Sequence, residues 1–232
     1  MEFTLLAAAA FALTGLYAML WWEARHGNAS RCSGNLFEVA ITSAALGIFI
    51  GRLVAMILDG VNPVTHPADV LLVRAGVSTV GATLGAIAVF AWLSRRELVP
   101  MADGVAAAAL AGLAGWHAGC IARDACLGTA SDLPWAVAQE GSAITRHQVG
   151  LYAALLFGVA AVVIAVWKAY RWPGFGVPAS AAIAAAGMIR LLTQPMQPSL
   201  DGGPVWFYAL GVVVGVLGVV WFARARRIER QN

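Results

Sequence analysis

The stretch GWHAGCIARDACLGTASDLPWAVAQEGSAITRHQVGLY, from Gly115 to Tyr152, is the longest polar and chemically varied interval of this sequence. It contains two histidines, two cysteines and several charged side chains, and an apolar run long enough to cross a bilayer lies on each side of it. Ionisable groups are costly at a membrane unless they are paired or used. The sequence therefore predicts a functional site here, held at a membrane surface by the rest of the chain.

The composition is that of an integral membrane protein. Of the 232 residues, 60% are hydrophobic and 12% are charged, and the mean hydropathy is +0.77, which ordinary soluble domains do not reach. The net charge is +3, but the basic residues form short clusters between apolar runs, which argues against nucleic-acid binding. Three cysteines cannot form a disulfide framework, although a single bridge from Cys120 to Cys126 stays open if that loop faces an oxidising side.

Apolar runs of about 20 residues predict an all-α polytopic membrane helix bundle, a single transmembrane domain over residues 1–232. The seven expected spans are residues 3–22, 36–58, 70–93, 99–122, 149–167, 177–192 and 205–222. The first, third and fifth connections and the C-terminal tail hold 10 of the 15 lysines and arginines. The positive-inside rule then places the N-terminus outside, the C-terminus in the cytoplasm and the polar loop 123–147 on the outer side. Small residues at four-residue spacing in the spans indicate close helix packing.

Five arginines lie outside these basic clusters, each in the outer half of a span or in an outward loop. They are Arg52, Arg74, Arg123, Arg146 and Arg190. A guanidinium group binds phosphate oxygens through two hydrogen bonds and is more weakly hydrated than an ammonium group. Arginines from separate segments at one depth predict a shared anionic ligand. The alternative is that each one extends to the interface or pairs with a nearby acid.

Other polar residues in the spans have several interpretations. His117, Cys120 and Arg123 share one face if their helix continues, and the alternative for His117 is a buried histidine bonded to a backbone carbonyl. The histidines and cysteines match no compact zinc pattern, so neither a metal nor a cofactor is expected. Glu38 and Asp103, near the cytoplasmic ends of their spans, are assigned an interfacial or helix N-terminal role.

Four motifs of the polar stretch occur in an order and spacing typical of one family. They read GC at 119–120, GT at 128–129, DLPWAV at 132–137 and RHQVGLY at 146–152. Together with GRLVAMIL from residue 51 and GVSTVGATLG from residue 76, they resemble the prolipoprotein diacylglyceryl transferases over roughly residues 36 to 195. Seven spans with the N-terminus outside also agree with that family.

The sequence departs from the family pattern at several motif positions. Val80 stands where the family has a histidine, His117 where it has an arginine, and Cys120 where it has an asparagine. Gln148 and Gly150 replace a proline and a glutamine in the motif that opens the next helix. These changes fall in the motifs that carry the family's chemistry.

The resemblance implies a multi-pass enzyme of the bacterial cytoplasmic membrane that moves a diacylglyceryl group from phosphatidylglycerol to the thiol of a lipobox cysteine in a precursor protein. Such chemistry requires a group that holds the lipid phosphate and a base that forms the thiolate. The arginines, Arg146 and Arg52 above all, are the candidate phosphate ligands. His147 or His117 is the candidate base, because a histidine near its ordinary pKa suits that work, and Tyr152 is the candidate orienting group.

Structural roles remain open for these residues, with Arg146 as an interfacial anchor, His147 as a helix cap and Tyr152 as an aromatic at the membrane boundary. Two other functions also remain open. One is a phospholipid-dependent transferase that uses another anionic phospholipid or another acceptor, and the other is a non-catalytic lipid-binding membrane protein. An electron-transfer or metal protein built on His117 and His147 is a more distant alternative.

Overall fold

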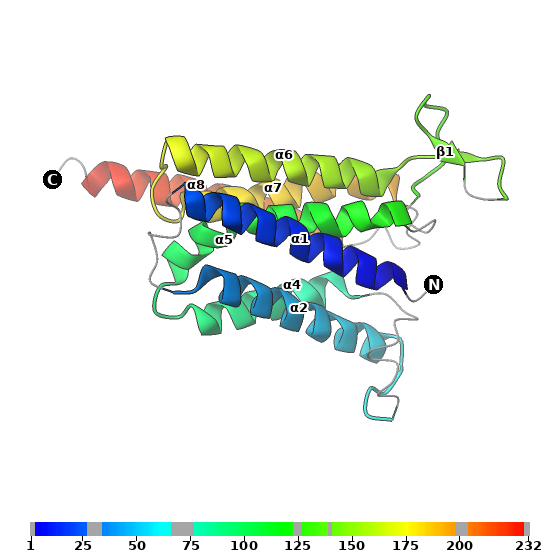
Figure 1. Ribbon diagram of the computed structural model, residues 1–232, viewed down its shortest axis with the longest axis horizontal. Helices are drawn as coiled ribbons and strands as arrows, with labels where there is room; N and C mark the ends of the chain where they lie inside the picture. The colour runs from blue at the N-terminus through cyan, green and yellow to red at the C-terminus, as the bar shows by residue number, and fades with distance from the viewer. Residues whose placement is uncertain are drawn as a thin grey trace.

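The structure, a computed structural model, describes residues 3–26, 34–65, 77–122, 127–138, 141–197 and 204–229. Within these ranges the chain forms seven α-helices that run alongside one another (Figure 1). They are α1 (Phe3–Arg25), α2 (Leu36–Leu58), α4 (Thr79–Leu93), α5 (Leu98–Ala118), α6 (Val149–Tyr170), α7 (Val177–Thr193) and α8 (Val205–Glu229). Two 3-10 turns, η2 (Gly119–Ala122) and η4 (Gln194–Met196), follow α5 and α7.

Five of the described helices have the length and composition of membrane helices. In the described part of the chain, α2, α5, α6, α7 together with η4, and α8 are long and apolar enough to cross a bilayer. The 15 residues of α4 are also apolar, and the first part of the span predicted there lies outside the described residues. The prediction of a polytopic all-α membrane bundle is therefore confirmed in its main feature.

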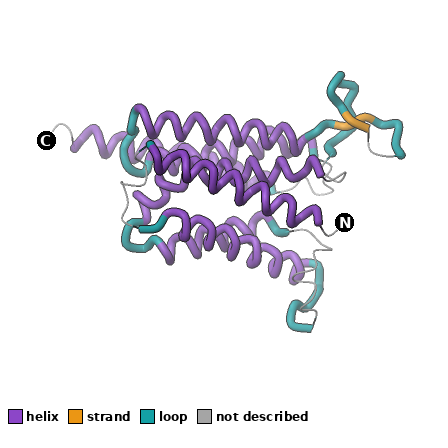
Figure 2. The backbone as a smooth tube through the Cα atoms, viewed as in Figure 1, coloured by secondary structure: helices purple, strands orange, loops and turns teal. Residues whose placement is uncertain are grey.

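The polar loop contains regular structure that the sequence analysis did not predict. Strands β1 (Val137–Ala138) and β2 (Thr145–Arg146) form an antiparallel pair in which Val137 lies opposite Arg146. Figure 2 shows this hairpin at one end of the bundle, beyond the start of α6. Two-residue strands are too short to give a periodic signal, so only the structure reveals that the loop is organised.

The helix α5 ends earlier than predicted. It stops at Ala118 and the chain continues in the turn η2, so Cys120 does not extend a helical face from His117. Close packing explains why the residue at this turn is a glycine. A Cβ atom on Gly119 would lie 2.5 Å from the Cα atom of Ala8 in α1, which only glycine avoids. Arg123, the third residue of the predicted face, lies outside the described residues.

Small residues bring the helices together, as the sequence predicted. The main core lies between α5, α6 and α7 and consists largely of alanines around Phe157, which is fully buried. A Cβ atom on Gly115 would lie 2.1 Å from the backbone oxygen of Phe11, so α1 and α5 touch backbone to backbone. The pair α2 and α4 packs together in the same way, and a cluster around Leu36 and Met101 joins it to α5.

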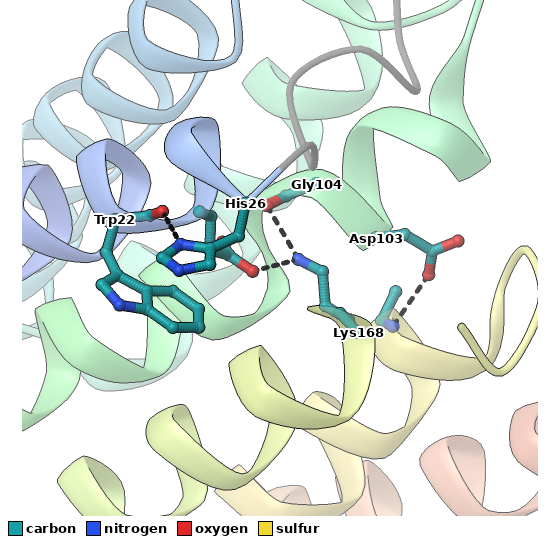
Figure 3. A network of polar contacts seen from close by, with 7 residues as sticks. Trp22, His26, Asp103, Gly104 and Lys168 are labelled. Atoms are coloured by element: carbon teal, nitrogen blue, oxygen red, sulfur yellow. Dashed lines mark hydrogen bonds and ion pairs between the residues drawn. The ribbon is translucent and has the colours of Figure 1, made fainter. Parts of the chain in front are cut away.

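A buried ion pair joins α1 and α6 at the end of the bundle opposite the hairpin. The Lys168 Nζ atom lies 2.6 Å from Glu23 Oε1, and both side chains are 2% exposed. Lys168 also donates a hydrogen bond to the backbone oxygen of Gly104 in α5 (Figure 3). The predicted span 149–167 leaves Lys168 among the basic residues of the fifth connection. Lys168 lies instead in the last turn of α6, inside the bundle.

The buried carboxylate of Asp103 holds the start of α7 at the same end of the bundle (Figure 3). Its Oδ2 atom accepts the Gly176 N–H at 2.6 Å and its Oδ1 atom accepts the Ala179 N–H at 2.9 Å. N–H groups at the start of a helix have no acceptor within that helix. The Asp103 carboxylate supplies this acceptor for α7. The sequence predicted an interfacial or helix N-terminal role for Asp103 in its own span, whereas the structure buries it and uses it to cap α7.

Candidate functional site

Backbone hydrogen bonds hold the motif residues at the hairpin end of the bundle. The Gly128 N–H donates to the His147 oxygen at 2.7 Å, and the His147 N–H donates to the Thr129 oxygen at 3.1 Å. The Thr129 N–H donates to the oxygen of Met196 in η4 at 2.8 Å. The segment at 128–129 therefore joins the end of α7 to the start of α6.

Arg146 and His147 present buried nitrogen atoms at this junction. The Arg146 Nη1 atom donates to the Gly128 oxygen at 3.3 Å. Its Nε atom and the Nδ1 atom of His147 are buried without a hydrogen-bond partner among the described residues. Buried nitrogens in native proteins normally have a partner, so these two atoms indicate a place where a polar ligand fits.

Tyr152 extends this cluster along the first turns of α6. Its ring lies edge-on to His147, with 6.1 Å between the ring centroids. The Trp135 Nε1 atom donates to the Tyr152 hydroxyl at 2.8 Å, and the Gln148 side chain donates to the backbone oxygen of Trp135 at 3.1 Å. The contacts of Trp135 and Gln148 were not predicted, because they join a loop to a helix and have no local pattern.

A second cluster lies between α5, α6, α7 and α8. The His117 ring stacks on Phe157 with 5.5 Å between centroids and 8° between planes, and Arg190 is near enough to act on His117 electrostatically. The Arg190 Nη2 atom donates to Gln194 at 3.2 Å and to the Tyr208 hydroxyl at 3.0 Å. Its Nη1 atom is buried without a hydrogen-bond partner in the described part of the chain. Two predicted site residues from different helices, His117 and Arg190, thus lie within electrostatic range of each other.

The two clusters meet where η2 packs on the first turn of α6. A Cβ atom on Gly150 would lie 2.6 Å from the Cβ atom of Cys120 and 3.3 Å from the backbone oxygen of His117. Glycine at 150 therefore allows the end of α5 to contact α6. Cys120 is disulfide-bonded, and its predicted partner, Cys126, lies outside the described residues.

The other predicted arginines are Arg52, Arg74 and Arg123. Arg52 is 4% exposed on α2, which packs chiefly against α4, so it belongs to a different helix pair from Arg190. Arg74 and Arg123 lie outside the described residues. No group of three or more histidine, cysteine or acidic side chains within those residues has an arrangement that would hold a metal ion.

A bundle of helices apolar enough to cross a bilayer, with basic and hydroxyl side chains gathered at one end, defines a membrane protein whose candidate site lies near a bilayer surface. The family model of the prolipoprotein diacylglyceryl transferases matches residues 2–222. The chain belongs to this family of membrane transferases.

Individual relatives agree with this assignment. The chain is similar to the phosphatidylglycerol–prolipoprotein diacylglyceryl transferase of Methylobacillus flagellatus, with 31% identity over 196 residues, 78% of this chain and 75% of the relative. The protein of the same name from Cereibacter sphaeroides is 29% identical over 228 residues, covering 82% and 77% of the two chains. That of Pseudoalteromonas translucida is 33% identical over 169 residues, covering 68% and 63%.

Proposed function

We propose that this chain transfers the diacylglyceryl group of phosphatidylglycerol to the thiol of a lipobox cysteine in a precursor protein. Family membership supports the proposal, and one observation carries the site. Arg146, His147 and Arg190 each keep a buried nitrogen that has no hydrogen-bond partner among the described residues, all at the hairpin end of the bundle. A phosphodiester supplies oxygen acceptors and a negative charge, which suit this set of guanidinium and imidazole groups.

The reaction divides into two requirements that these side chains can meet. The cysteine thiolate attacks the glycerol carbon that carries the phosphate ester, so that a C–S bond forms and the C–O bond breaks. The electron pair of the broken bond goes to the phosphate oxygen, and glycerol phosphate leaves. Cations placed beside the phosphate stabilise the charge that develops on it, and a base takes the thiol proton.

We assign phosphate binding to Arg146 and Arg190, and the base to His147. The Nδ1 atom of His147 is buried without a partner among the described residues, and it lies in the same segment as Arg146. Tyr152 is assigned to the phosphate as a hydroxyl donor. His117, stacked on Phe157 and within electrostatic range of Arg190, is the second candidate base. Arg52, Arg74 and Arg123 remain proposed phosphate ligands on the evidence of the sequence.

The proposed orientation has seven spans, the N-terminus outside, the C-terminus in the cytoplasm and the hairpin on the outer face of the bacterial cytoplasmic membrane. The distribution of charge supports it, because the basic residues that follow α4, α6 and the apolar part of α8 gather at the end opposite the hairpin. The disulfide of Cys120 also supports it, since disulfides persist on the oxidising side of a membrane.

Reconstituted protein tests the proposal directly. Purified protein in phosphatidylglycerol liposomes, incubated with a lipobox peptide, is expected to give a diacylglyceryl adduct on the peptide cysteine by mass spectrometry. Phosphatidylcholine liposomes and a peptide with serine in place of cysteine are expected to give none. Arg146→Ala and His147→Ala should each lower the rate about 100-fold or more, the usual effect of losing a charge-stabilising group or a base. Arg95→Ala, an exposed arginine at the opposite end, should leave the rate unchanged.

Other outcomes separate the alternatives. Consumption of phosphatidylglycerol without a peptide adduct would indicate a transferase with another acceptor. Retention of phosphatidylglycerol without consumption would indicate a lipid-binding protein that has lost catalysis. A rate that is unaffected by both Arg146→Ala and His147→Ala would show that the site lies elsewhere in the bundle.

A further inference from the structure

The hydrogen bond between Trp135 and Tyr152 has only one possible direction. An indole N–H donates and has no acceptor atom, whereas a tyrosine hydroxyl has one donor proton and two acceptor lone pairs. In the 2.8 Å contact from Trp135 Nε1, the Tyr152 oxygen is therefore the acceptor. The single proton of Tyr152 is left to point toward another group.

The position of the Trp135 indole is fixed from the same helix turn that carries Tyr152. The Gln148 side-chain nitrogen donates to the Trp135 backbone oxygen at 3.1 Å, and the Ala136 N–H closes a tight turn on the Leu133 oxygen at 2.9 Å. Gln148 is the N-cap residue of α6, yet its side chain makes no capping bond to the helix. Its amide is instead used to hold Trp135.

Core packing does not explain this arrangement. Trp135 is 57% exposed, so other side chains of the protein cover only a minor part of it. Hydrogen bonds nevertheless hold Trp135 at its indole nitrogen and at its backbone oxygen. This arrangement indicates that the tryptophan positions the group to which its indole donates. That group, Tyr152, lies edge-on to His147, the proposed base, which directly follows Arg146 in the chain.

We propose that Trp135 and Gln148 are positioning residues, which fix the Tyr152 hydroxyl as a hydrogen-bond donor to the phosphate of the lipid substrate. This inference rests on the proposed function. Gln148 holds the Trp135 backbone, the Trp135 indole occupies one lone pair of the Tyr152 oxygen, and the Tyr152 proton is directed at an anionic oxygen. A hydroxyl that accepts a hydrogen bond also becomes a better donor, because hydrogen bonds in a chain polarise one another.

A double-mutant cycle separates this role from simple bracing of the hairpin. Tyr152→Phe should lower kcat/KM for phosphatidylglycerol about 10-fold or more, as expected for a hydrogen bond to a charged group. Trp135→Phe keeps an aromatic ring and removes the N–H, and it should give a loss of about 3- to 10-fold through Tyr152. Added to Tyr152→Phe, it should cause no further loss, because the group on which it acts is already gone.

Matched measurements make the outcome specific. Gln148→Ala should follow the same pattern as Trp135→Phe, and neither change should alter the KM for the lipobox peptide. Trp206→Phe, a change of the same kind at an exposed tryptophan of α8, should have no effect. Native mass spectrometry of the same four proteins measures how much phosphatidylglycerol each retains relative to phosphatidylcholine. This measurement of lipid binding requires no acceptor peptide.

The possible results distinguish the inference from the proposed function. Losses from Trp135→Phe that multiply with those from Tyr152→Phe, in turnover and in lipid retention, would overturn the inference while leaving the function intact. Full activity and full retention in Tyr152→Phe would also overturn it. A wild-type protein that makes no peptide adduct would overturn the proposed function, and the retention cycle would then decide the inference by itself.

Discussion

Replacing Lys168 by methionine tests what holds the bundle together at the end opposite the hairpin. Lys168 and Glu23 are each 2% exposed, with 2.6 Å between Nζ and Oε1, and Lys168 also donates to Gly104. Lys168→Met keeps the apolar stem but leaves the Glu23 carboxylate buried without its cation. Removing one partner of a buried ion pair costs about 3–5 kcal/mol, and we expect the free energy of unfolding to fall by that amount.

The double variant Lys168→Met with Glu23→Met makes the prediction sharper. Apolar residues of similar volume often replace a buried ion pair with little net cost, so the double variant should lie within about 1–2 kcal/mol of the wild type, the remaining loss reflecting the hydrogen bond to Gly104. Steric trapping in bicelles measures these free energies of unfolding. Arg171→Met, an exposed basic residue just after α6, serves as the control and should change them by about 0.5 kcal/mol or less.

Two results would refute this reasoning. A loss below about 1 kcal/mol in Lys168→Met would mean that the pair is far more hydrated than its exposure indicates. A double variant whose loss equals the sum of the two single losses would mean that the residues act independently.

Other predictions concern single contacts. Asp103→Ala should lower the free energy of unfolding by about 2 kcal/mol, measured in the same way, because two N–H groups at the start of α7 lose their acceptor. Gly150→Ala should cost about 1–3 kcal/mol, since its Cβ atom would lie 2.6 Å from that of Cys120. Gly158→Ala in the same helix, where the nearest atom is 4.0 Å away, should be neutral or stabilising by up to about 1 kcal/mol. Equal effects of the two alanines would contradict the close contact at 150.

The sequence was sufficient to predict an all-helical bundle with apolar, membrane-length helices, and the family. The predicted spans at 36–58 and 177–192 correspond to α2 and α7 within one residue at each end. Hydropathy is a property of consecutive residues, so a window of the sequence contains the information that decides whether a segment crosses a bilayer. The motif at 146–152 is local in the same sense, because Arg146, His147 and Tyr152 are close neighbours along the chain and lie together in any fold that keeps this segment intact.

Contacts between distant segments could not be predicted in this way. No pattern in the sequence indicates that His117 stacks on Phe157, that Trp135 donates to Tyr152, or that Lys168 pairs with a glutamate of α1. The small residues that allow close packing occur in many of the helices, so they show that helices touch without showing which faces meet. The sequence by itself determined which segments form apolar helices and which motif residues are neighbours along the chain. The tertiary structure decided which polar groups from different helices face one another, because that depends on how the helices are rotated and aligned, which a pattern within one helix does not specify.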